Sequence, residues 1–145
     1  MHDEAPQGNA PDCVSRLDQI MTADINRPEI VAEVRAAFDR YNAAIDSKDV
    51  AILNELFWKS DSTVRFGFSE NLFGHDAIVE FRGTKWLNAP ARRATRVVIT
   101  TIGRDCATTS AVMERGDGVT RQSQTWVRFP EGWRIVAAHV SALKS

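Results

Sequence analysis

Cysteine is scarce in this sequence, and long apolar runs are missing. The 145 residues include two cysteines, Cys13 and Cys106, which are too few for a disulfide framework and favour a reducing compartment. No segment approaches the roughly 18 apolar residues of a membrane-spanning helix. The N-terminus lacks the basic start and apolar core of a secretion signal. These absences lead us to expect a soluble, cytoplasmic protein.

A net charge of one sign is missing too. The 18 basic and 19 acidic side chains leave a formal charge of −1, which argues against a surface that binds nucleic acid or an anionic membrane through bulk charge. Most of the basic residues are arginine rather than lysine, and they are concentrated in the second half of the chain. We therefore expect neither nucleic acid nor a membrane as a partner.

The common signatures of nucleotide binding, metal binding and nucleophilic catalysis are also absent. The sequence contains no glycine-rich phosphate loop, no H-E-x-x-H, no paired C-x-x-C and no G-x-S-x-G elbow. The only plausible metal ligands, His75, Asp76 and His139, are too far apart in sequence to suggest a metal site. Cys106 lies in an apolar run, where a thiol behaves as a small hydrophobic residue. We expect a function that needs no metal and no cofactor.

The length and composition predict one folded domain. The hydrophobic content of 43% is enough to build one core in a chain of this size. Residues 1–24 combine proline, glycine and scattered charges with little periodicity, and we expect them to be a flexible leader. Residues 25–145 form the expected single domain.

Three helices are predicted in the first part of this domain. Asn26 is the expected N-cap of a long helix over residues 29–47, in which apolar residues recur every three or four positions and form one face. Asp49 is the expected cap of a shorter helix that runs to residue 58, and a third helix covers residues 76–86. Helices that precede a run of strands indicate an α+β order.

The rest of the domain has the pattern of strands. Residues 63–68 alternate as a strand, and residues 70–74 have the composition of a turn. Four longer strands follow, over residues 93–102, 106–114, 119–129 and 133–143. The turn residues between them predict successive antiparallel hairpins. The predicted fold is α+β: a cone-shaped, curved antiparallel sheet wrapped around the long N-terminal helix, with a pocket between them. The outer face of such a sheet needs cover, so we expect a homodimer.

Two residues suggest a function for the predicted pocket. Tyr41, the only tyrosine, lies on the apolar face of the long helix, where a buried phenol needs a hydrogen-bond partner. A backbone partner would make it an ordinary core residue. Arg65 lies on the strand face opposite Val64 and Phe66, so either that face or Arg65 points to the helix. An inward Arg65 can grip a carboxylate bidentately, whereas an outward one is a solvated surface residue.

Four further polar residues are weaker candidates for ligand binding. Gln122 and Gln124 share a strand face and suit an amide- or urea-like ligand, although an edge or interface strand explains them equally well. Alternation places His139 on the same strand face as Ile135, where a histidine is either a general base or a satisfied core residue. Asn71 suits a turn as well as a ligand site.

Seven blocks of sequence, spread over residues 25–143, carry a resemblance to a known family. They are Ile25–Glu29, Phe38–Tyr41, Leu56–Trp58, Thr63–Gly67, Glu70–Gly74, Gln122–Trp126 and Gly132–Ser141. Together they resemble the AtzH/HpxZ family, which belongs to the SnoaL-like branch of the nuclear transport factor 2 superfamily. The resemblance implies a cone-shaped α+β fold, a dimer, and a pocket between the long helix and the concave sheet.

The resemblance also implies a chemistry. AtzH-like members act in cyanuric acid breakdown, where a decarboxylating amidohydrolase converts 1,3-dicarboxyurea to allophanate. HpxZ-like members accompany oxalurate catabolism in purine degradation. The functional tyrosine and arginine of AtzH match Tyr41 and Arg65 of this chain. Phe66 and Phe73 stand where many relatives have tyrosine, which leaves Tyr41 as the only phenol.

Three classes of function follow from these observations. The first is a decarboxylating amidohydrolase of a small anionic ureide, with Tyr41 and Arg65 as catalytic residues and Asn71, Gln122, Gln124 and His139 as substrate-binding residues. The second is a non-catalytic ureide-binding protein of oxalurate catabolism, with an amidase of the same pathway as its candidate partner. The third, acid/base chemistry on a steroid or polyketide, needs a pocket carboxylate, but Asp39 and Asp46 lie off the apolar face.

Overall fold

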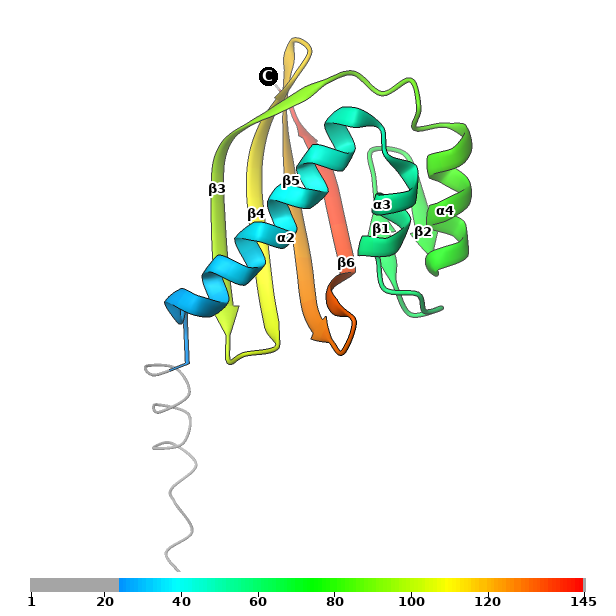
Figure 1. Cartoon of the computed structure of the whole chain (residues 1–145). Helices are drawn as coiled ribbons and strands as arrows, with labels where there is room; N and C mark the ends of the chain where they lie inside the picture. The colour runs from blue at the N-terminus through cyan, green and yellow to red at the C-terminus, as the bar shows by residue number, and fades with distance from the viewer. Residues whose placement is uncertain (1–23, 145) are drawn as a thin grey trace, which may run out of the picture.

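The computed structural model describes residues 24–144 of the chain (Figure 1). Residues 1–23 of the expected leader, which include Cys13, lie outside the described residues. The elements follow in the order α2 (Pro28–Ser47), α3 (Val50–Leu56), β1 (Val64–Phe66), β2 (Asn71–Phe73), α4 (His75–Thr84), β3 (Arg92–Ile102), β4 (Cys106–Arg115), β5 (Gly118–Phe129) and β6 (Gly132–Leu143). None of the described helices has the length and apolar character needed to span a membrane.

One six-stranded sheet, in the order β2-β1-β6-β5-β4-β3, organises the domain. The predicted hairpins β3–β4, β4–β5 and β5–β6 are all present and antiparallel. The pairing of β1 with β6 is parallel, with Val64 opposite Ala137, so the prediction of a purely antiparallel sheet is wrong at this place. The predicted turn at residues 70–74 is also wrong, because it contains β2, which pairs with β1.

Helix α2 crosses the concave face of the curved sheet, while α3 and α4 lie beside the β1–β2 end (Figure 1). The face of α2 that the apolar spacing predicts is buried, and its members are Ile30, Val34, Phe38, Tyr41, Ala44 and Ile45. These side chains belong to one core that includes Met113, Trp126 and Ile135 of the sheet. Burial of this face holds the helix on the sheet, since apolar contact is the main favourable term in folding. The predicted fold class is confirmed.

The two predicted helix caps have different outcomes. Asp49 caps α3 as predicted, because its side chain accepts a hydrogen bond from Ile52 N at 3.2 Å. Arg27, and not Asn26, is the N-cap of α2, and no side chain caps this helix. Asn26 instead has a φ of 56°, and its Oδ1 accepts from Thr101 N at 2.9 Å. Asparagine is among the few residues that tolerate this left-handed conformation, so Asn26 ties the start of α2 to β3.

Replacement of Asn26 by alanine is expected to lower the free energy of unfolding by about 1–2 kcal/mol, because Thr101 N loses its acceptor and alanine is strained at positive φ. Asn26→Gly is the matched control, since glycine keeps the backbone conformation at less cost. Urea denaturation measures both variants. An alanine variant as stable as the wild type would contradict this role for Asn26.

A β-bulge in β6 changes which side chains face the core. The register of β5 and β6 shifts where Thr125 pairs with Ala137 but Trp126 pairs with Ile135, so Val136 is an extra residue. An extra residue interrupts the alternation of side chains along a strand. Beyond the bulge Ala138 is buried, whereas His139 is exposed. The predicted shared face of Ile135 and His139 is therefore wrong.

Candidate functional site

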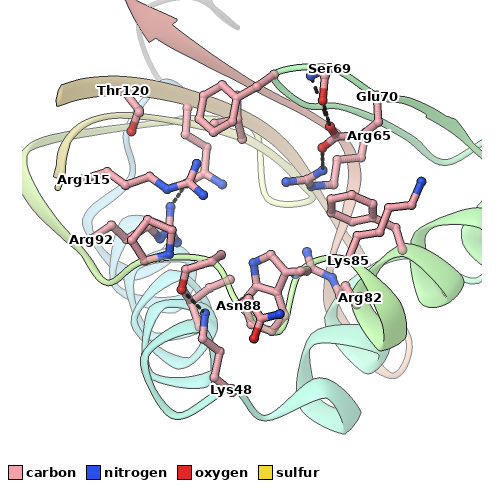
Figure 2. Close-up of a pocket in the computed structure, with 18 of the residues that line it drawn as sticks. Lys48, Arg65, Ser69, Glu70, Arg82, Lys85, Asn88, Arg92, Arg115 and Thr120 are labelled. Atoms are coloured by element: carbon pink, nitrogen blue, oxygen red, sulfur yellow. Dashed lines mark hydrogen bonds and ion pairs between the residues drawn. The ribbon is translucent and has the colours of Figure 1, made fainter. Parts of the chain in front are cut away.

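A cavity of about 330 Å³ opens between α2, α4, the β1–β2 turn and the neighbouring ends of β3 and β4 (Figure 2). Its lining is rich in cationic side chains, namely Lys48, Arg65, Arg82, Lys85, Arg92 and Arg115, whereas Glu70 is the one acidic residue among the described residues that line it. Cations gathered in a cavity with low-dielectric walls focus their field into it. The arrangement suits a small ligand that carries more than one negative charge.

Tyr41 reaches this cavity from α2. It is 2% exposed, and its hydroxyl oxygen accepts a hydrogen bond from Gln122 Nε2 at 3.0 Å. The orientation of the Gln122 amide is fixed by its other end, because Arg92 Nη1 donates to Gln122 Oε1 at 3.1 Å. The Tyr41 hydroxyl accepts from Gln122 and keeps its own hydrogen for another acceptor, as a proton donor to a ligand requires.

The electrostatic surroundings make Tyr41 a stronger acid. Burial acts to raise the pKa of Tyr41, but the positive charges of Arg92, Arg82 and Arg65 act against it, and so does the hydrogen bond from Gln122. The balance lowers the pKa of Tyr41 from 10.0 to about 8. A phenol with a pKa close to neutral pH is better matched to proton transfer than an ordinary tyrosine.

Arg65 points into the cavity from β1, which resolves the two orientations that the sequence left open. Its Nη1 is 2.9 Å from Glu70 Oε1, and its guanidinium lies 5.2 Å from the centroid of the Phe81 ring. A Cβ at Gly67 would overlap the Glu70 carboxylate, so glycine at this position leaves room for the ion pair. Burial acts to raise the pKa of Glu70, but the bonds from Arg65 and Ser69 outweigh it and lower that pKa.

Arg82 is buried on α4 without an acidic partner among the described residues. It is 1% exposed, and its Nε and Nη2 atoms have no hydrogen-bond partner there. The rings of Phe57 and Trp86 flank its guanidinium, with centroids at 5.0 and 5.3 Å. Burial lowers the pKa of Arg82. A buried cation with unpaired N–H groups beside a cavity is costly unless an anion joins it.

Comparison with known proteins agrees with the fold and assigns the family. The sequence model of the AtzH-like family matches residues 23–145. This chain belongs to the AtzH-like family. No functionally curated protein matches this AtzH-like chain at a significant level.

Three solved structures illustrate the likeness. A protein of unknown function from Pectobacterium atrosepticum is 45% identical, with a TM-score of 0.83 over 86% of this chain and 99% of the other. A cystatin-like fold protein from Burkholderia xenovorans is 40% identical, with a TM-score of 0.78 over 84% of this chain and 98% of the other. A nuclear transport factor 2-like protein from Salmonella enterica is 24% identical, with a TM-score of 0.67 over 81% and 93%. The third comparison shows the fold alone.

The structure brings some of the sequence-predicted residues of this AtzH-like protein together and separates others. Tyr41, Arg65 and Gln122 line the cavity. Gln124 is buried but does not line it, because its Oε1 accepts from Thr109 Oγ1 at 3.1 Å within the core.

His139 and Asn71 do not line the cavity either. Asn71 is an exposed residue of β2. His139 lies with Arg121, Ser123 and Ser141 in a shallow depression elsewhere on the sheet, because the bulge at Val136 turns it away from the core. The prediction that these two residues share a pocket with Tyr41 is therefore wrong.

Sequence reasoning missed the cations other than Arg65. The excess of arginine over lysine was visible, but nothing local showed which arginines converge. For Arg82 one signal existed, since it follows the buried Ile78 by four positions on the same face of α4. Within residues 24–144 no group of three or more His, Cys, Asp or Glu side chains could hold a metal ion.

Proposed function

We propose that this AtzH-like protein is a cofactor-independent decarboxylating amidohydrolase that converts 1,3-dicarboxyurea to allophanate in cyanuric acid and s-triazine breakdown. The observation that supports it most is the position of the Tyr41 hydroxyl, which has a lowered pKa and a free hydrogen, in a cavity with six cations. The proposed substrate is a small planar dianion, and its charge complements that lining.

Binding is assigned first to Arg65. Its guanidinium presents two parallel N–H donors to one carboxylate of the substrate, which is the geometry in which arginine is stronger than lysine. Glu70 already neutralises part of Arg65 at 2.9 Å, so the substrate carboxylate must share Arg65 with Glu70 or displace it. The fixed cations then supply the positioning and electrostatic stabilisation that catalysis without a nucleophile requires.

Tyr41 supplies the proton. As the bond between a urea nitrogen and its carboxylate carbon breaks, the bonding electrons stay on nitrogen, and nitrogen receives the Tyr41 proton. The products are carbon dioxide and allophanate, and the tyrosinate takes a proton back from water. The reaction needs no oxidant or reductant, so one proton donor is sufficient to balance it.

The test is release of carbon dioxide or bicarbonate by the purified protein from freshly made 1,3-dicarboxyurea, with oxalurate as the comparison substrate. The expected result is enzyme-dependent release from dicarboxyurea above its spontaneous decay. A thermal shift with either ureide but no release would overturn the enzymatic proposal and favour the alternative, a ureide-binding accessory protein of oxalurate catabolism. Co-purification with an amidase would strengthen that alternative.

A further inference from the structure

Two arginines face each other across the strand pair at the far end of the cavity. Arg92 of β3 and Arg115 of β4 are Cα partners in the antiparallel register. The adjacent pair, Arg93 and Glu114, has opposite charges and forms an ion pair of 2.7 Å. Like charges directly opposite each other destabilise a sheet, so the Arg92–Arg115 pair is unfavourable unless something neutralises it.

The described residues provide no carboxylate for this pair. No acidic side chain among residues 24–144 lies within ion-pair distance of either guanidinium. The partners of Arg92 are neutral: Met113 Sδ at 2.7 Å, Gln122 Oε1 at 3.1 Å and Asn42 Oδ1 at 3.1 Å.

Among residues 24–144, the contact that holds the Arg115 side chain is an aromatic face, because its guanidinium lies 4.8 Å from the centroid of the Phe68 ring. Burial lowers the pKa of Arg115, and the charges of Arg92 and Arg65 lower it further. Two half-buried cations with no carboxylate of the described residues within ion-pair distance form an incomplete site for an anion.

The pair lies on the opposite side of the cavity from Arg65. In the sheet order β2-β1-β6-β5-β4-β3, the strand of Arg65 is near one end, and the strands of Arg92 and Arg115 are at the other. Figure 2 shows Arg65 and Arg82 entering the cavity from one side, and Arg92 and Arg115 entering from the other. The ring of Tyr41 is 5.6 Å from the Arg92 guanidinium, and its hydroxyl is within the field of both sides.

We infer that Arg92 and Arg115 form a second carboxylate subsite, so that the cavity grips both ends of a planar dianion across Tyr41, and that Arg115 determines the preference for dianions over monoanions. This inference deepens the proposed function and rests on it for the identity of the natural ligand. Asn42 and Gln122 hold Arg92 in place, whereas Arg115 stays free to close on the carboxylate.

The experiment is an NMR titration with two unreactive probes of equal length. Glutarate has a carboxylate at each end with the same number of chain atoms as 1,3-dicarboxyurea, and its monoamide has one carboxylate replaced by a neutral amide. The wild type is expected to bind glutarate roughly tenfold to a hundredfold more tightly than the monoamide, as one charged hydrogen-bonded contact provides. Arg115→Gln is expected to bind the two probes almost equally, and Arg115→Lys is expected to regain part of the preference.

Arg93→Gln is the matched control, because Arg93 is one residue from Arg92 but is exposed and paired with Glu114. It should keep the wild-type preference. A wild type without the preference, or an Arg115→Gln variant that retains it, would overturn the second subsite. Preference for glutarate without turnover of dicarboxyurea would leave the subsite standing and reject the proposed reaction. Turnover of dicarboxyurea without the preference for glutarate would reject the subsite and leave the proposed reaction standing.

Discussion

Replacement of Tyr41 by phenylalanine is expected to lower kcat on 1,3-dicarboxyurea by about 10²–10⁴-fold, which is the usual contribution of a positioned proton donor. The substitution removes one oxygen and keeps the ring, which packs 6.5 Å from Phe38 and 6.5 Å from Phe57 between centroids. The carboxylate-binding arginines are untouched, so the affinity for glutarate should change little. Steady-state release of bicarbonate and the glutarate titration measure the two quantities separately.

The same residue predicts a pH dependence. A proton donor must be protonated, and the cations around Tyr41 lower its pKa to about 8. The value of kcat/KM, which reports ionisations of the free enzyme, is therefore expected to be flat near neutral pH and to fall above about pH 8. In Tyr41→Phe the residual rate should lack this decrease.

Two results would contradict the role of Tyr41. Full turnover by Tyr41→Phe would remove the phenol from the mechanism. A kcat/KM that rises through pH 8 would show that the tyrosinate, and not the tyrosine, is the active form. A loss of activity caused by unfolding is recognised separately by urea denaturation. The substitution leaves the buried Gln122 Nε2 without its acceptor, so the free energy of unfolding should fall by about 1–3 kcal/mol.

The parts of the fold that follow local rules could be predicted from the sequence. The periodicity of α2 predicted its buried face, and Asp49 predicted the start of α3. The hairpin turns were visible from the turn residues between the strands, and the structure gives Gly103, Gly116 and Gly132 positive φ angles of 64°, 58° and 126°, which glycine adopts without strain. These signals each involve a few neighbouring residues.

The parts that depend on distant pairing could not be predicted. The parallel contact of Val64 with Ala137 joins segments far apart in the chain, and no turn between them sets their direction. The bulge at Val136 has no composition signal, yet one extra residue moves His139 off the core face.

The site shows the same division. Tyr41 was a candidate because it is a phenol on an apolar helix face, and Arg65 because it lies on the strand face opposite Val64 and Phe66; the family resemblance then implied a function for both. Arg92 and Arg115 come from separate strands, and only the register of β3 with β4 makes them neighbours. A near-neutral composition therefore concealed a strongly basic cavity.

Arg82→Met is expected to stabilise the protein without ligand and to impair its function. The wild-type side chain is buried with two nitrogen atoms unpaired among the described residues. Even buried ion pairs are often replaced by apolar side chains with a gain of about 1–4 kcal/mol, and a buried charge without an acidic partner has less to lose. We expect urea denaturation to give a higher free energy of unfolding. The gain should reach the upper end of this range only if methionine packs well between Phe57 and Trp86. Arg35→Met, at an exposed position of α2, is the matched control and should change stability little.

The functional loss in Arg82→Met has a distinct signature. Removal of a positive charge that lowers the pKa of Tyr41 must raise that pKa, so the decrease of kcat/KM should move to higher pH. The affinity for glutarate should fall by roughly tenfold or more, since one cation on the Arg65 side is gone. A variant that is less stable than the wild type, or one with an unchanged pH profile, would show that Arg82 is a structural residue. Greater stability together with weaker binding is the expected result for a cation retained for its ligand at the expense of the fold.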